Sequence, residues 1–228
     1  MIEMLMRLSG FLYLLILVLT IVYTSFGYIL EPTQKHYESD YKLQDFNNNP
    51  KKFKISVGLA LIEHSCVVIL AIMLFFVISP YNILLGIICI IFRGWEGSIQ
   101  VYNEKDYRSL FNIAKQYSMS SGEEKLSLMD SYCSILKTKS KRFATAMVGW
   151  SIGTFALSIV LVTYALVIPF IGWLGIIASI LIGVANVMRL AKPEIKAYET
   201  LSSISGLLAI LFELLIGIAL LFFPPIVS

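Results

Sequence analysis

The sequence predicts an all-α membrane protein, a bundle of six transmembrane helices with one amphipathic helix on the membrane surface. The first basis is composition: 57% of the 228 residues are hydrophobic and only 14% are charged, whereas soluble domains carry about 25% charged residues. The second is a set of apolar runs long enough to cross roughly 30 Å of hydrocarbon. Together they exclude a disordered chain and most soluble enzymes. The net charge of +3 is too small to indicate a nucleic-acid partner.

Six apolar runs are long enough to span a bilayer as helices. They cover residues 9–30, 55–78, 82–103, 143–167, 170–190 and 201–223. The first run lacks the basic flank and the cleavage site of a signal peptide, so we expect it to be retained. Short turns around Pro80 and Pro169 predict that spans two and three, and spans four and five, form helical hairpins. We expect residues 1–228 to form a single membrane domain.

Two long polar segments, 31–54 and 104–142, connect the spans. In the first, the string Asn47–Pro50 is typical of a helix breaker, and we expect irregular chain. In the second, Ser121–Glu124 has the pattern of a capping box that opens a helix. The apolar residues that follow fall on one helical face; they are Leu126, Met129, Tyr132, Ile135 and Leu136. This helix is expected on the membrane surface, either as a linker whose stripe lies in the headgroups or as a docking site for a protein partner.

Basic residues predict the orientation in the cell membrane. Sixteen of the eighteen Lys and Arg residues lie in segments 31–54, 104–142 and 189–200. Loops rich in Lys and Arg stay in the cytoplasm. We therefore expect these three segments in the cytoplasm and both termini outside.

Several polar residues interrupt the apolar runs. The ionisable ones are Glu63, His64, Arg93, Glu96 and Glu213, and the milder cases are Gln100 and Asn186. A charge at mid-bilayer costs about 2.5–3.5 kcal/mol on insertion scales, so such residues usually face the bundle interior. The spacing of Arg93, Glu96 and Gln100 puts them on one helical face. Depth along the spans brings Glu63 and Glu213 to a similar level, so we expect one shared cluster, here called the polar node.

The polar node has a structural and a functional interpretation. A buried pair of Arg93 with one carboxylate, Glu63 or Glu213 of another helix, would set helix register. One arginine cannot neutralise three acids, however, and the surplus predicts a protonated carboxylate, a bound cation or a cationic ligand. The neighbours Glu63 and His64 should point about 100° apart on a helix and make a poor shared metal site. We expect neither a metal nor a cofactor.

Small residues recur at four-residue spacing in spans four and five. They are Gly149, Gly153, Gly175, Ser179 and Gly183. The string Gly149–Gly153 also matches the G-x-S-x-G pattern, but that chemistry needs a strand-to-helix turn and this string lies inside a span. Faces of small residues allow close helix packing, within the chain or between copies.

Four short strings carry a family resemblance. They are Arg7, Gly10, Leu12, Tyr13 and Leu14 in the first span; Phe92–Glu96 in the third; Pro169 with Leu174 and Gly175 near the fifth; and Glu213–Leu221 in the last. In these strings the chain resembles the bacterial and archaeal six-span membrane family catalogued as domain of unknown function 4386. The resemblance implies six spans and no assigned activity, and it singles out Arg93, Glu96 and Glu213. The family often has a basic residue beside the proline, where this chain has Phe170 and Ile171, so the resemblance does not give the orientation.

Three functions follow from these patterns. The first is binding or transport of a proton, a cation or a small cationic solute at the polar node. The second is a non-catalytic membrane subunit or scaffold that binds a protein through segment 104–142. The third is an intramembrane enzyme in which Glu63, Glu96 and His64 relay protons. Since no nucleophile or metal ligand accompanies them, we do not expect an enzyme.

Overall fold

The computed structural model describes residues 1–26, 36–192 and 197–224, and these are helical almost throughout, without a strand. The helices are α1 (Ile2–Ser25), α2 (His36–Asn48), α3 (Pro50–Ile78), α4 (Ile83–Asn103), the 3-10 helix η1 (Glu104–Asp106), α5 (Tyr107–Tyr117), α6 (Gly122–Thr163), α7 (Pro169–Ala191) and α8 (Ala197–Phe222). The all-α class is confirmed. The expected span end at 27–30, the start of the first polar segment at 31–35, and residues 193–196 of the last loop lie outside the described residues.

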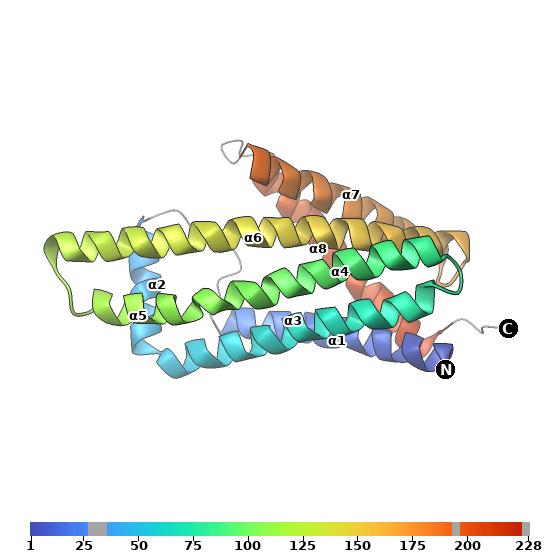
Figure 1. Ribbon diagram of the computed structural model, residues 1–228, viewed down its shortest axis with the longest axis horizontal. Helices are drawn as coiled ribbons and strands as arrows, with labels where there is room; N and C mark the ends of the chain where they lie inside the picture. Colours follow the sequence, from blue (N-terminus) through green and yellow to red (C-terminus); the bar gives the residue numbers. More distant parts are fainter. Residues whose placement is uncertain (27–35, 193–196, 225–228) are drawn as a thin grey trace.

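Six helices are long and apolar enough to cross a membrane: α1, α3, α4, α6, α7 and α8. In chain order each packs against the next, and α8 packs against α1, so the six form a closed ring. Figure 1 shows these helices from the side, running along the length of the molecule. Both expected hairpins are present. The side chain of Asn82 caps α4 by accepting a hydrogen bond from the backbone N–H of Leu85 at 3.0 Å, and Pro169 begins α7, where a missing N–H costs nothing. The protein is therefore membrane-embedded.

Small residues let neighbouring helices of the ring approach closely. A Cβ atom placed on Gly149 would lie 2.9 Å from the carbonyl oxygen of Phe92 in α4, and one on Gly175 would lie 2.5 Å from the Phe212 ring in α8. The hydroxyl of Ser151 donates to the carbonyl oxygen of Ser179 in α7 at 2.7 Å. The close packing predicted for these faces is thus made between helices of the same chain.

Helix α6 differs from the prediction in one respect. It begins at Gly122 with Ser121 as its N-cap residue, as expected, although the Ser121 side chain makes no capping hydrogen bond. The expected helix does not lie flat on the membrane: it continues for 42 residues into the fourth span, ending at Thr163. The physical reason is that no proline or glycine interrupts residues 123–148, so nothing separates the amphipathic turns from the apolar ones.

The polar segments fold into an extension beyond the ring, built from α2, the start of α3, α5 and the first half of α6 (Figure 1). Its core is apolar and aromatic, and the buried members are Leu43, Phe46, Phe53, Val57, Leu110, Ala114, Tyr117, Met129, Tyr132 and Leu136. The rings of Phe46 and Phe53 stack with centroids 3.8 Å apart. The expectation of irregular chain is wrong for residues 36–54, because Pro50 occupies the first turn of α3 and so separates two helices rather than ending helical structure.

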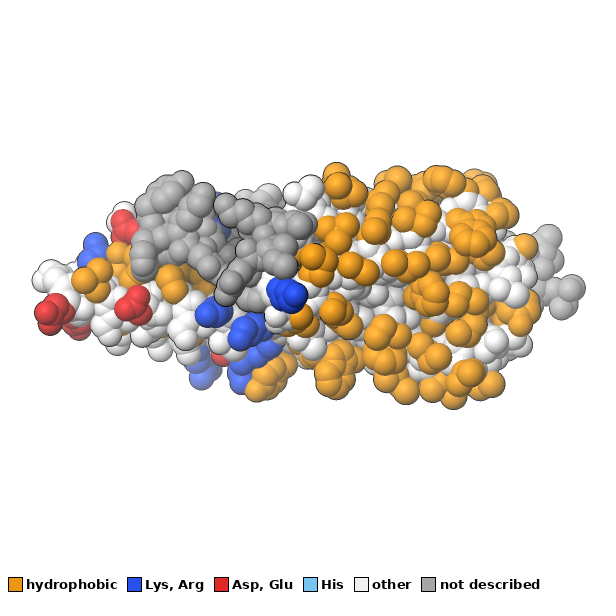
Figure 2. Space-filling view, turned by 90° about the horizontal axis from the view of Figure 1, so that it is seen from above, with side chains coloured by type: hydrophobic (Ala, Val, Ile, Leu, Met, Phe, Trp, Pro, Cys, Tyr) orange, Lys and Arg blue, Asp and Glu red, His pale blue; other side chains and the backbone are white. Residues whose placement is uncertain are grey.

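Side chains on the surface divide the molecule into two halves. Figure 2 shows apolar side chains over the ring and charged side chains over the extension. Large apolar residues on every spanning helix are exposed, among them Val18, Ile69, Ile91, Phe155, Ile177 and Ile210. Exposure of this kind is stable in hydrocarbon and costly in water. The ring is thus the part that lies in the membrane.

Candidate functional site

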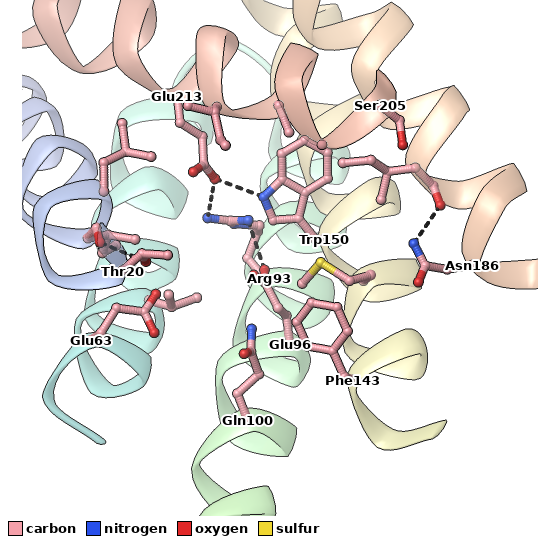
Figure 3. Close-up of a pocket in the computed structure, with 18 of the residues that line it drawn as sticks. Thr20, Glu63, Arg93, Glu96, Gln100, Phe143, Trp150, Asn186, Ser205 and Glu213 are labelled. Carbon is pink, nitrogen blue, oxygen red and sulfur yellow. Dashed lines mark hydrogen bonds and ion pairs between the residues drawn. The ribbon is translucent and has the colours of Figure 1, made fainter. Parts of the chain in front are cut away.

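The ring contains a partly open cavity of about 310 Å³ that all six spanning helices line. Its walls come from the half of the ring nearest the extension, including Thr20 of α1, Phe143 of α6, Asn186 of α7 and Ser205 of α8 (Figure 3). The opposite half is filled by a close-packed apolar core that contains Leu70, Leu74, Ile78, Leu157, Leu161 and Ile171. The cavity therefore ends near the middle of the ring.

Arg93 lies at the inner end of the cavity and is 1% exposed. Its Nη1 atom is 2.8 Å from Oε2 of Glu96 on the same helix, and its Nη2 atom is 3.8 Å from Oε1 of Glu213 on α8. The indole Nε1 of Trp150 donates to the same Glu213 oxygen at 2.8 Å, and the guanidinium lies 5.8 Å from the centre of the Trp150 ring (Figure 3). The predicted pairing of Arg93 with Glu213 is confirmed. Three helices are thereby joined through one guanidinium.

Glu63 lines the cavity but makes no ion pair with Arg93. Its Oε2 atom instead contacts Nδ1 of the adjacent His64. The expectation that these two side chains point apart is therefore wrong, because the three rotatable bonds of glutamate let its carboxylate turn back toward the imidazole. His64 itself does not line the cavity. Its Nε2 atom is 4.0 Å from Oε1 of Glu104.

The two milder polar residues, Gln100 and Asn186, also line the cavity. Asn186 donates to the carbonyl oxygen of Ile182 in its own helix at 2.9 Å, which satisfies part of its amide. Thus six of the seven residues predicted for the polar node face one cavity, and His64 contacts it through Glu63.

Sequence reasoning missed several residues of the site. Trp150 and Phe143 form aromatic walls, but within an apolar run an aromatic residue has no feature that separates a cavity wall from the core. Glu104 and Lys139 are 5% and 8% exposed, and Nζ of Lys139 is 3.2 Å from Oε1 of Glu104. Both residues fall in the polar segment 104–142, where a charged residue is not unusual, and only the fold of the extension buries them.

The cavity lining is acidic. Glu63, Glu96 and Glu213 face it, and Arg93 is the single basic residue among the described residues that line it. The remaining wall is mostly apolar and aromatic, with uncharged polar side chains at Thr20, Gln100, Asn186, Ser202 and Ser205. Within the described ranges no group of three or more His, Cys, Asp or Glu side chains is arranged to hold a metal ion. The arrangement can accept hydrogen bonds and positive charge in a space that has room for water or a small solute.

Residues 8–223 match the family described as "Domain of unknown function (DUF4386)". Searches of curated proteins and of solved structures each found no match. The matched range begins in α1 and ends one residue after α8, so it includes part or all of each spanning helix and every residue of the polar node. The chain therefore belongs to the DUF4386 family.

Proposed function

We propose that this protein is a non-catalytic carrier of the cell membrane that binds a small cation in the cavity of the ring. The observation that carries the proposal is that three carboxylates and one guanidinium line a single cavity. A buried charge needs a partner, and Arg93 can fully pair with one carboxylate only. The remaining negative charge is the binding determinant for a cation or a proton.

The size and walls of the cavity favour a small organic cation. Ligand cavities range over about 300–1,000 Å³, so the 310 Å³ of this one admits a compact solute. Trp150, Phe143 and Tyr23 line it, and the faces of aromatic rings attract ammonium groups. Carboxylates and aromatic rings in one lining make a combination suited to a methylated or primary amine.

The position of the cavity supports transport rather than storage. It occupies one half of the ring, and the apolar core fills the other half down to the Pro80 turn. Transporters hold their substrate near the middle of the bilayer and open to one side at a time. With the basic segments in the cytoplasm, as the charge distribution predicts, the cavity lies in the cytoplasmic half of the membrane.

The proposal does not depend on a docked protein. Three residues of the apolar stripe in segment 104–142, Met129, Tyr132 and Leu136, are packed into the core of the extension. Leu126 is the strongly exposed member, at 68%. A single exposed leucine is ordinary for a protein surface.

Thermal unfolding of the detergent-solubilised protein tests the proposal. Chloride salts of tetramethylammonium, choline, methylammonium, sodium and potassium are compared at equal ionic strength. A ligand at 100 times its Kd stabilises by about 2.7 kcal/mol, which is a rise in Tm of about 5–10 °C for a chain of this size. Glu63→Gln should reduce the rise, and the exposed Glu124→Gln should not. Equal Tm values in all five salts would overturn the proposal.

A further inference from the structure

A line of buried ionisable side chains leads from the cavity to the extension. It consists of Glu63 and His64 in α3, Glu104 in η1 and Lys139 in α6, with 5%, 2%, 5% and 8% of their surfaces exposed. Glu63 lines the cavity of the ring, whereas Lys139 lines a small hollow in the extension beside Phe53. The four residues thus connect two parts of the molecule through an otherwise apolar interior.

His64 is placed to exchange protons at both ring nitrogens. Nδ1 contacts Glu63 and Nε2 is 4.0 Å from Oε1 of Glu104. The edge of the Tyr23 ring meets the imidazole, with centroids 6.4 Å apart and planes at 71°, which restricts rotation of the imidazole. Imidazole accepts a proton on one nitrogen while it donates from the other. A closure of about 1 Å would bring Nε2 and Glu104 to hydrogen-bond distance.

The outer end of this line lies next to partly exposed charges. Glu104 is two residues from Asp106, and Lys139 is three residues from Arg142. Asp106 and Arg142 pair at 2.7 Å, and 20% and 25% of their side-chain surfaces are exposed. The amide of Asn103 donates to the carbonyl oxygen of Lys139 at 3.3 Å, which ties the end of α4 to α6 at this point. Glu104 therefore lies two residues from an ion pair that is partly exposed to solvent.

We propose that Glu104, His64 and Glu63 form a proton relay between the extension and the cavity. The carboxyl of Glu104 gives a proton to Nε2 of His64, and the imidazolium gives its Nδ1 proton to the carboxylate of Glu63. One proton enters the imidazole at Nε2 and one leaves it at Nδ1, so a proton has passed from Glu104 to Glu63 and His64 has changed from its Nδ1–H tautomer to its Nε2–H tautomer. A return of the proton from Nε2 to Nδ1 completes the cycle. Lys139 compensates the charge left on Glu104, from 3.2 Å away.

Each helix packed around the relay contributes to its electrostatic environment. The titratable and charged groups that face it are Tyr23 from α1, Cys66 from α3, Arg93 and Glu96 from α4, Lys139 from α6 and Glu213 from α8. Glu63 and Glu104 flank His64, and Lys139 lies on the far side of Glu104, so a proton on His64 has carboxylates as its immediate charged neighbours.

Proton delivery to Glu63 has a consequence that rests on the proposed function. A neutral Glu63 removes one negative charge from the cavity, and the attraction for a cation falls. Protons and cations then compete for the cavity, and a proton gradient drives cation exchange. The relay itself requires no cation.

The relay is tested by its rate, with Trp150 as the reporter. The chain has three tryptophans. Replacing the two at exposed sites, by Trp95→Phe and Trp173→Phe, leaves Trp150 as the single tryptophan. A stopped-flow jump from pH 8 to pH 5.5 should change its emission as Glu63 is protonated. His64→Gln should slow this phase at least about tenfold and leave its end point unchanged, since a positioned acid–base group contributes about 10²–10⁴-fold. His36→Gln is the matched control, and Glu63→Gln should abolish the phase.

Three outcomes would overturn the relay: an unchanged rate in His64→Gln, a persistent phase in Glu63→Gln, or no response of Trp150 to pH. If His64→Gln fails to fold, the wild-type rate in D₂O decides, because a rate limited by proton transfer falls and one limited by another step does not. The jump uses a buffer without organic cations. If the stopped-flow rates behave as expected but no cation raises the Tm, only the proposed cation binding is rejected. If a cation raises the Tm but His64→Gln leaves the rate unchanged, only the relay is rejected.

Discussion

Replacing each of the three cavity carboxylates by glutamine should produce three different losses of stability. Glutamine keeps the shape of glutamate and removes its charge. Glu96 holds the guanidinium of Arg93 at 2.8 Å, Glu213 holds it at 3.8 Å, and Glu63 contacts His64 instead. The order of destabilisation should therefore be Glu96→Gln, then Glu213→Gln, then Glu63→Gln.

The sizes follow from the distances. At an effective dielectric constant of about 20, unit charges attract by about 6 kcal/mol at 2.8 Å and about 4 kcal/mol at 3.8 Å. Removing one member of a buried pair costs about 3–5 kcal/mol, and we expect this for Glu96→Gln. Glu213→Gln should cost about 2–3 kcal/mol, since its oxygen still accepts from Trp150. Glu63→Gln loses one contact with a neighbouring side chain, worth about 0.5–1.5 kcal/mol.

Thermal unfolding in detergent at neutral pH separates the variants, because 1 kcal/mol corresponds to about 2–4 °C in a chain of this size. Glu96→Gln should unfold at least about 3 °C below Glu63→Gln. Glu124→Gln, at an exposed position of α6, is the control and should match the wild type. Equal values for the three cavity variants would refute the pairing scheme. Three equally large losses would mean that a bound cation, rather than Arg93, is held by all three carboxylates.

Three further predictions concern the ring, the extension and the orientation. A Cβ atom placed on Gly10 would lie 2.5 Å from a backbone nitrogen of α8, whereas one placed on Gly94 would meet nothing within 4 Å. Gly10→Ala should therefore lower the stability by about 1–3 kcal/mol, and Gly94→Ala should leave it unchanged. Equal Tm values for the two variants would contradict the closed ring. The Tyr117 hydroxyl donates to Asp40 at 2.6 Å and lowers the pKa of that carboxyl, so its stabilisation is present above the unfolded pKa of about 3.9 and is lost as the pH falls through the lower folded value. Tyr117→Phe should therefore lower stability at pH 7 more than at pH 3, measured by circular dichroism, and a pH-independent difference would exclude this role. Ser121→Cys on a cysteine-free background should resist an impermeant maleimide in intact cells and react after lysis; labelling of intact cells would reverse the proposed orientation.

The site residues that could be predicted from the sequence are the charged residues that interrupt apolar runs. Arg93, Glu96 and Glu213 stand out because a charge in an apolar run is costly and needs a partner inside the bundle. The six spans were found for the related reason that long apolar runs have few other uses. Composition along the chain is enough to recognise both features.

Features that depend on tertiary packing were not predictable. Helix α2 has a polar sequence, and it is stabilised by Leu43 and Phe46, which are buried in the core of the extension. Helical propensity decides little when packing supplies most of the stability. The burial of Glu104 and Lys139 depends likewise on how α6 meets the end of α4. The contact between Glu63 and His64 depends on side-chain torsions, which no spacing rule contains.

Because α6 is long, a small tilt of this helix would displace its far end by several ångströms. At 1.5 Å per residue its 42 residues extend about 63 Å, roughly twice the hydrocarbon thickness of a bilayer. Trp150 and Phe143 lie on its membrane half and its far end is the tip of the extension, about 42 Å from Trp150. A tilt of roughly 5° about the cavity would displace that tip by roughly 4 Å if the helix stays straight. Any tilt of α6 that accompanies filling of the cavity would be largest at the tip, where a fluorophore outside the membrane can follow it.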